Sequence, residues 1–90
     1  MSLRILSSPP PEPADVARDL SRAISAALPG AQVSVQIGSP GHFELAVASK
    51  EFAGLSRVQQ QQRVYAAIRH LMAGDAAPVH AIDRMTTRVP

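Results

Sequence analysis

The feature that most constrains the fold is a pair of short runs in which apolar and polar residues alternate. The runs span residues 32–37 and 42–49, and the residues between them, Gly38-Ser-Pro-Gly41, have the composition of a turn. Alternation with a period of two places every second side chain on the same face of a β-strand. We therefore expect a β-hairpin with one apolar face. The side chains on that face are Val33, Val35, Ile37, Phe43, Leu45 and Val47.

Segments with apolar residues at helical spacing flank this hairpin. Pro13 suits the first turn of a helix that ends at Pro29-Gly30, and Ser56 with Gln59 forms a capping-box pattern before a helix that runs to about Ala73. Each helix should bury one apolar stripe. The first stripe comprises Val16, Leu20, Ile24, Ala27 and Leu28. The second comprises Val58, Tyr65, Ile68 and Met72, with Val64 and Leu71 beside it.

A third strand is predicted over residues 79–86, although Asp83 and Arg84 interrupt its apolar alternation. The order helix, strand, strand, helix, strand predicts an α+β two-layer sandwich with a three-stranded mixed sheet. One face of that sheet should pack on the helices, and the other should meet water or a partner. A chain of 90 residues has room for a single domain, which we place at residues 13–90 after a flexible, proline-rich segment at residues 1–12.

The composition excludes several classes of protein. Without cysteine, the chain has neither a disulfide framework nor a thiolate metal site of its own. No apolar run approaches the roughly 18–20 residues that span a bilayer, and residues 1–12 lack the order of a secretory signal. A net charge of +2 is too small to indicate nucleic-acid binding. We expect a cytoplasmic protein that is not an enzyme, because no spacing supports a catalytic triad or paired carboxylates, and that is a monomer or a weak homodimer.

The histidines are the candidates for chemistry. His42 opens the second alternating run, His80 lies in the third, and His70 lies late in a helix, where a surface cation suits the helix dipole. An iron–sulfur cluster usually has four ligands, mostly thiolates, and histidine replaces cysteine in some centres. Histidines of this chain would therefore complete a site whose thiolates come from elsewhere. The alternatives are a half-buried His80 that forms local hydrogen bonds and a His42 that fixes the turn.

Several separated motifs in the same order resemble the BolA family. The similarity runs from about Gln32 to Ala81, and the short hairpin loop and the pattern Gln61-Gln-Arg-Val-Tyr65 are closest to the YrbA-like (IbaG-like) branch. The resemblance implies α-β-β-α-α-β order, similar to the class II KH fold. The motifs are Ser39-Pro-Gly-His-Phe-Glu-Leu-Ala-Val-Ala-Ser49, Phe52-Ala-Gly54, Val64-Tyr65 and Val79-His-Ala-Ile82.

The resemblance also implies a function. It implies an adaptor that binds a monothiol glutaredoxin and shares a 2Fe–2S cluster with it and with glutathione, in iron–sulfur cluster trafficking or iron homeostasis. His80 matches the family's C-terminal histidine ligand, and His42 is the hairpin candidate for a second ligand. The isolated chain should bind no cluster. Asp83-Arg-Met85 departs from the small and apolar residues that usually alternate in this strand.

The alternative function is a KH-like, DNA-binding transcriptional regulator of a stress or morphology response. Gly38 and Gly41 match the Gly-X-X-Gly of KH domains, but that loop joins two helices, whereas this one lies in a hairpin. The candidate nucleic-acid contact is Arg57, where a phosphate would meet a helix start. Arg57, Arg63 and Arg69 are six residues apart, and steps of roughly 240° around the helix form no basic stripe.

Overall fold

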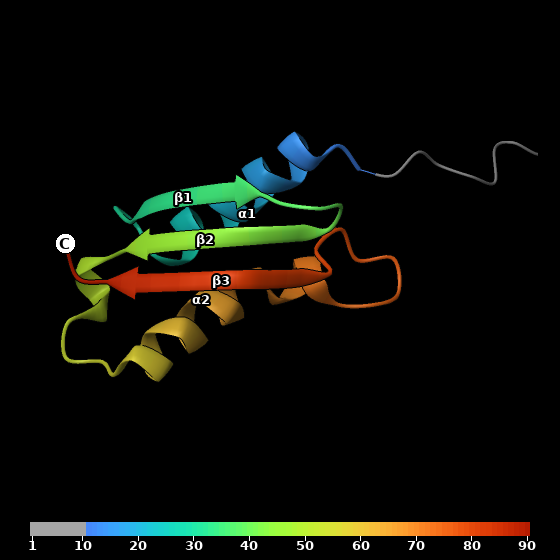
Figure 1. The fold of residues 1–90 in the computed structure, drawn as a ribbon. Coiled ribbons are helices and arrows are strands. Elements are labelled where there is room, and N and C mark those ends of the chain that lie inside the picture. The colour runs from blue at the N-terminus through green and yellow to red at the C-terminus, as the bar shows by residue number, and fades with distance from the viewer. Residues whose placement is uncertain (1–10) are drawn as a thin grey trace, which may run out of the picture.

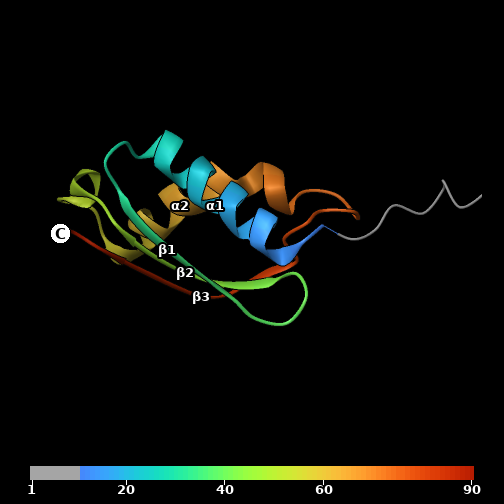
Figure 2. The ribbon, with the colours of Figure 1, turned by 90° about the horizontal axis from the view of Figure 1, so that it is seen from above.

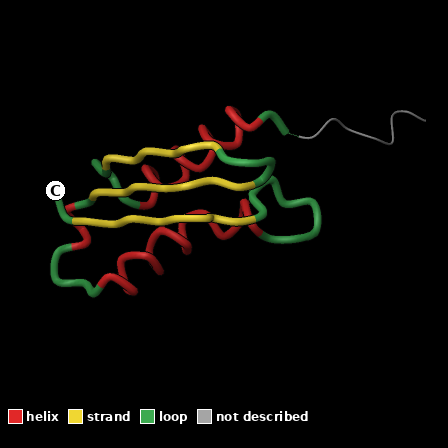
Figure 3. Tube along the Cα trace, in the orientation of Figure 1, coloured by secondary structure: helices red, strands yellow, loops and turns green. Residues whose placement is uncertain are grey.

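The computed structural model describes residues 11–90. Most of the segment expected to be flexible, residues 1–12, lies outside the described residues. Figure 1 shows the elements in order along the chain, and Figure 3 shows the loops that join them. The elements are α1 (Pro13–Ala27), β1 (Gln32–Ile37), β2 (His42–Ala48), the 3-10 helix η2 (Lys50–Phe52), α2 (Arg57–Met72) and β3 (Ala81–Arg88).

The three strands form one mixed sheet in the order β1-β2-β3. β1 and β2 are antiparallel, as a hairpin requires, and β3 runs parallel to β2 after the crossover through α2. Both helices cover the same face of the sheet, and the other face is bare (Figure 2). The predicted α+β two-layer sandwich with a three-stranded mixed sheet is thus confirmed. The resemblance implies a further helix after the hairpin, and the three-residue η2 occupies that position.

The core lies between the helices and the sheet. The apolar face predicted for β2 is buried, and the stripe of α1 is buried except for Ala27, which is exposed. On the edge strand β1, Ile37 is 49% exposed and lies next to the turn that closes the hairpin. The core cluster comprises Val16, Leu20, Ile24, Leu28, Phe43, Leu45, Val47, Phe52, Val64, Ile68 and Val79.

The buried face predicted for α2 is wrong at Val58 and Tyr65, whereas Ile68, Val64, Met72 and Leu71 belong to or pack against the core as expected. Val58 and Tyr65 are 61% and 39% exposed, whereas Gln60, Val64 and Ile68 are buried. Both sets obey helical spacing, so apolar spacing alone could not choose between them. Gln60 occupies a core position because its amide is satisfied there. Its Nε2 donates to the Leu55 carbonyl at 3.1 Å, and its Oε1 accepts from Thr87 Oγ1 at 2.8 Å.

The start of α2 agrees with the sequence. Ser56 Oγ accepts from the Gln59 N–H at 3.1 Å, and Gln59 Oε1 accepts from the Ser56 N–H at 2.9 Å. This reciprocal pair is the predicted capping box. The run of four glutamines at residues 59–62 therefore has structural roles, since Gln59 caps the helix and Gln60 bridges it to β3.

The third strand begins two residues later than predicted and contains a β-bulge. Phe43 pairs with Ile82 while Glu44 pairs with Arg84, so Asp83 has no partner on β2. The extra residue shifts the alternation by one position and lets Ile82 and Met85 both pack against the core. This bulge explains the interrupted apolar pattern of the strand.

Candidate functional site

His42 and His80 lie at the same end of the sheet, where the hairpin loop meets the α2–β3 loop (Figure 1). His42 is the first residue of β2 and pairs with Ala81, the first residue of β3. The Gly41 carbonyl accepts from the N–H groups of His80 and Ala81, at 2.8 and 3.1 Å. These two hydrogen bonds attach the α2–β3 loop to the hairpin, so that His80 lies next to Ala81, the strand partner of His42.

A tight turn fixes the backbone of His42. The Gly38 N–H donates to the His42 carbonyl at 2.9 Å, and the His42 N–H donates to the Ser39 carbonyl at 2.8 Å. Gly41 has a φ of +79°, a conformation that L side chains rarely adopt. The turn predicted at Gly38–Gly41 is therefore present, and it determines where β2 begins.

The imidazole of His80 lies directly against Gly41. A Cβ atom on Gly41 would lie 2.5 Å from Nδ1 and 2.6 Å from Cγ of His80, far closer than two such atoms approach. Glycine is thus the residue that allows this placement. His80 is exposed, and in the described part of the chain its side chain forms no hydrogen bond or ion pair. The half-buried strand histidine considered from the sequence does not describe it.

A small apolar pocket adjoins His80 on the helix side of the sheet. It lies between the start of α1, the hairpin turn and the α2–β3 loop. His42 lies on the opposite side of the sheet. It points to the same side as its strand partner Ala81, whereas His80, one residue earlier in the chain, points to the other side. The residues that line the pocket are Pro11, Pro13, Val16, Pro40, Gly41, Phe43, Ala76, Ala77, Pro78 and His80.

His42 is paired with a residue that sequence analysis did not assign to it. Its Nδ1 lies 2.9 Å from Oδ1 of Asp83, the bulged residue of β3. The side chains of His42 and Asp83 are 38% and 49% exposed. The one sign of this contact in the sequence was that Asp83 departs from the small and apolar residues usual in this strand. Its partner was not predictable without the strand register.

The other candidates lie elsewhere. Arg57 is exposed at the first turn of α2, at the opposite end of the sheet from the histidines, and His70 is exposed near the end of α2. The capping box already uses two of the N–H groups at the start of α2, so fewer donors remain for a phosphate. The guanidinium Nη2 of Arg63 lies 3.3 Å from Oε1 of Glu51, so this arginine already has an acidic partner. Within residues 11–90, no group of three or more histidine, aspartate or glutamate side chains is placed to hold a metal ion.

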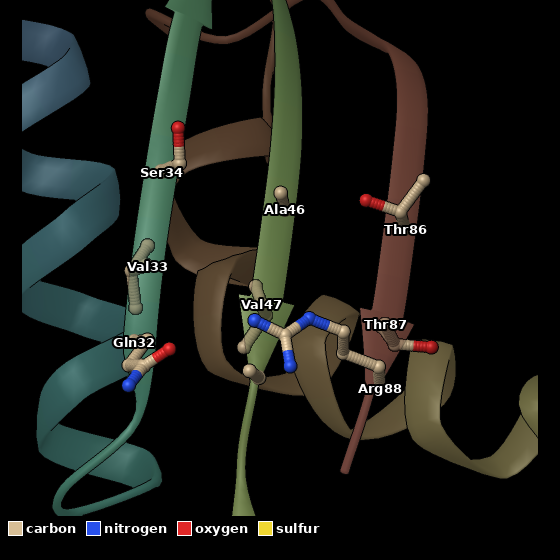
Figure 4. Close-up of a pocket in the computed structure, with 9 residues that line it drawn as sticks. Gln32, Val33, Ser34, Ala46, Val47, Thr86, Thr87 and Arg88 are labelled. Atoms are coloured by element: carbon tan, nitrogen blue, oxygen red, sulfur yellow. The ribbon is translucent and has the colours of Figure 1, made fainter. Parts of the chain in front are cut away.

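The bare face of the sheet has a second concave surface, at the end of the sheet away from the histidines. Figure 4 shows Ala46 on β2 between Ser34 on β1 and Thr86 on β3, with the Arg88 side chain lying across the face of β2. Small side chains form its floor, and amide, hydroxyl and guanidinium groups form its sides. None of the helices in the described residues has the length and apolar character needed to cross a membrane.

A comparison with protein families agrees with this geometry. The sequence profile described as BolA-like protein matches residues 22–89, from within α1 to the end of β3. This chain belongs to the BolA family. The match includes the hairpin, Gly41, both candidate histidines and Asp83, whereas the pocket residues at the start of α1 precede it.

Individual relatives support the assignment. A protein of Acinetobacter guillouiae, described as an uncharacterized protein in the rpoN-murA intergenic region, is 36% identical over 63 residues, which are 70% of this chain and 72% of that protein. BolA-like protein 1 of Bos taurus is 45% identical over 49 residues, or 54% of this chain. That match spans only 34% of the bovine protein's length.

Solved structures of BolA proteins share the fold. The bolA homologue of Coxiella burnetii superimposes with a TM-score of 0.66 at 28% identity, covering 81% of this chain and 88% of that one. BolA1 of Arabidopsis thaliana superimposes with a TM-score of 0.68 at 19% identity, covering 82% and 90%. These similarities confirm the two-layer α+β architecture. The assignment to the YrbA-like branch stays a prediction.

Proposed function

We propose that this BolA protein is a non-catalytic adaptor that binds a monothiol glutaredoxin and shares a 2Fe–2S cluster with it. The proposed role is iron–sulfur cluster trafficking or iron homeostasis in the cytoplasm. The observation that carries the proposal is the placement of His80. Its imidazole is exposed beside an apolar pocket and is left without a side-chain partner among residues 11–90. Family membership supports the same conclusion.

The ligand chemistry explains why the site needs a partner. The cluster is the cargo here, and its ligands are mostly thiolates. This chain has no cysteine. The glutaredoxin and glutathione would supply thiolates, and His80 would supply a neutral imidazole nitrogen, with His42 as the candidate second ligand from this chain. Because imidazole coordinates a metal only when it is neutral, the shared cluster should become less stable in acid.

The pocket beside His80 suits a docked protein surface. Its walls are mostly proline and alanine, which lose little side-chain entropy when a partner covers them. A partner side chain in this pocket would bring the thiolates of the glutaredoxin site toward the exposed ring of His80.

The proposal can be tested by cluster reconstitution. The chain is mixed with a monothiol glutaredoxin, glutathione, iron and sulfide without oxygen, and visible circular dichroism is recorded. We expect a spectrum that differs from that of the glutaredoxin alone, and we expect His80→Ala to abolish the difference. His70→Ala is the matched control because His70 is also an exposed histidine but lies on α2. An unchanged spectrum with the wild-type chain would refute the proposal.

The DNA-binding alternative has less support. Arg57 is the candidate contact, but Arg63 is already paired with Glu51, and the capping box occupies donors at the start of α2. The Gly38–Gly41 turn lies in the hairpin and is engaged with the α2–β3 loop. A backbone-clamping loop of the KH type would need to be accessible between two helices.

A further inference from the structure

The bulge in β3 places a carboxylate beside His42. Ile82 and Arg84 pair with consecutive residues of β2, so Asp83 is the additional residue between them. Both residues of a bulge face one residue of the partner strand, and bulges often redirect a side chain next to a functional site. In this chain, the redirected side chain is Asp83, and it reaches Nδ1 of His42 at 2.9 Å.

The contact contributes orientation more than stability. Both side chains are more than one third exposed, and exposed pairs of this kind contribute little to folding. The turn already fixes the backbone of His42 through the N–H of Gly38 and the carbonyl of Ser39. The remaining freedom is in the side-chain torsions of His42, and a hydrogen bond to one ring nitrogen restricts the rotation of the ring.

We propose that Asp83 is a positioning residue that fixes the ring of His42 through Nδ1 and leaves Nε2 as its available ligand atom. A carboxylate acceptor at Nδ1 requires the proton to be on that nitrogen, so the lone pair is on Nε2. Histidines that bind metals usually donate their other ring N–H to such an acceptor, which sets the tautomer and the ring orientation. Asp83 therefore prepares His42 as the second ligand in the proposed cluster site, and this last step rests on the proposed function.

The first test uses the isolated chain and needs no cluster. Long-range ¹H–¹⁵N spectra, recorded where His42 is neutral, distinguish the two tautomers, and the loss of signals in His42→Ala assigns them. We expect the wild-type ring to carry its proton on Nδ1 and Asp83→Ala to shift the population toward the Nε2–H tautomer. Asp83→Asn should give a tautomer population between those of wild type and Asp83→Ala, because its amide can accept from Nδ1–H through its oxygen or donate to an unprotonated Nδ1 through its nitrogen. Asp19→Ala, which removes an exposed carboxylate from α1, is the control.

A wild-type His42 with its proton on Nε2, or the same tautomer in Asp83→Ala as in wild type, would overturn the inference. The second test measures the rate of cluster loss from the glutaredoxin complex. Loss of a hydrogen-bond partner of this kind usually weakens metal binding roughly 10–100-fold, so Asp83→Ala should lose the cluster faster by about that factor. Asp83→Asn should lie between it and wild type.

The two tests separate this inference from the proposed function. If the wild-type complex forms no cluster, the proposed function fails, and the tautomer spectra still decide whether Asp83 orients His42. If the wild-type complex forms a cluster and Asp83→Ala loses it at the wild-type rate, the role of Asp83 in ligand positioning is refuted and the proposed function survives.

Discussion

Gly41→Ala should displace His80 while changing stability only modestly. The added Cβ would lie 2.5 Å from Nδ1 of His80, so the ring must move. Gly41 also has a φ of +79°, which an alanine adopts at a cost. The substitution therefore combines a backbone penalty with a side-chain collision, and the structure offers a control that separates the two.

The control is Gly30→Ala. Gly30 has a φ of +82°, nearly the same as that of Gly41, and a Cβ added there would meet no atom within 4 Å. A left-handed conformation costs a residue with a Cβ about 1–2 kcal/mol. The smaller entropy of the unfolded alanine chain offsets roughly 0.4–1 kcal/mol of that cost. Both variants should therefore lose on the order of 1 kcal/mol of stability from the backbone alone.

The collision adds a further term only in Gly41→Ala. Because His80 is exposed, its ring can swing into solvent, and a distorted rotamer costs about 0.5–1.5 kcal/mol. We expect Gly41→Ala to be less stable than Gly30→Ala by no more than about that amount in urea unfolding followed by circular dichroism. In ¹H–¹³C spectra, the ring signals of His80 should shift in Gly41→Ala and stay in place in Gly30→Ala.

A double-mutant cycle tests the cause. In His80→Ala, the ring that the new Cβ meets is absent, so Gly41→Ala should cost less in that background than in wild type. Groups in direct contact typically couple by about 0.5–3 kcal/mol. Equal costs in both backgrounds, together with unshifted His80 signals in Gly41→Ala, would refute the view that Gly41 accommodates the ring.

Two further predictions concern the packing of α2. Gln60→Ala should destabilise the fold by about 1–3 kcal/mol in urea unfolding, because the Leu55 carbonyl and the Thr87 hydroxyl lose their hydrogen-bond partner. The control Gln62→Ala, at an exposed position, should change stability by less than about 0.5 kcal/mol. Equal effects of the two substitutions would contradict the bridging role of Gln60. Ile68→Ala should cost roughly 2–5 kcal/mol and Val58→Ala well under 1 kcal/mol in the same assay. Equal costs would show that Val58 is buried, as the sequence predicted.

The sequence predicted those parts of the fold in which local pattern and tertiary burial agree. The alternation in β2 and the stripe of α1 each have one apolar face, and both faces pack on the core. In α2 two faces are compatible with helical spacing, one with Val58 and Tyr65 and one with Gln60 and Val64, and the second is buried. Gln60 is buried because Thr87 and the Leu55 carbonyl meet its amide, and these contacts exist only once β3 and the connector have packed.

The candidate site shows the same division between local and long-range information. His42 and His80 were identifiable as residues, but their surroundings depend on the pairing of β2 with β3. The register of that pairing sets Gly41 against His80 and the bulge sets Asp83 against His42. A one-residue change in this register would alter both contacts together.

The two histidines are oriented in different ways, and the difference bears on the proposed cluster site. His42 is oriented by an attractive, directional hydrogen bond that a carboxamide can partly replace. His80 is oriented by the absence of an atom at Gly41, and no other residue type provides that space. His80 is also attached through its own N–H to the Gly41 carbonyl, so its backbone position stays fixed when its ring moves. In the proposed complex, His80 would have to leave its resting position to reach a cluster on the partner protein, and this freedom would allow it. Because the backbone of His80 is fixed, its exposed ring can move without disturbing the strand that follows it.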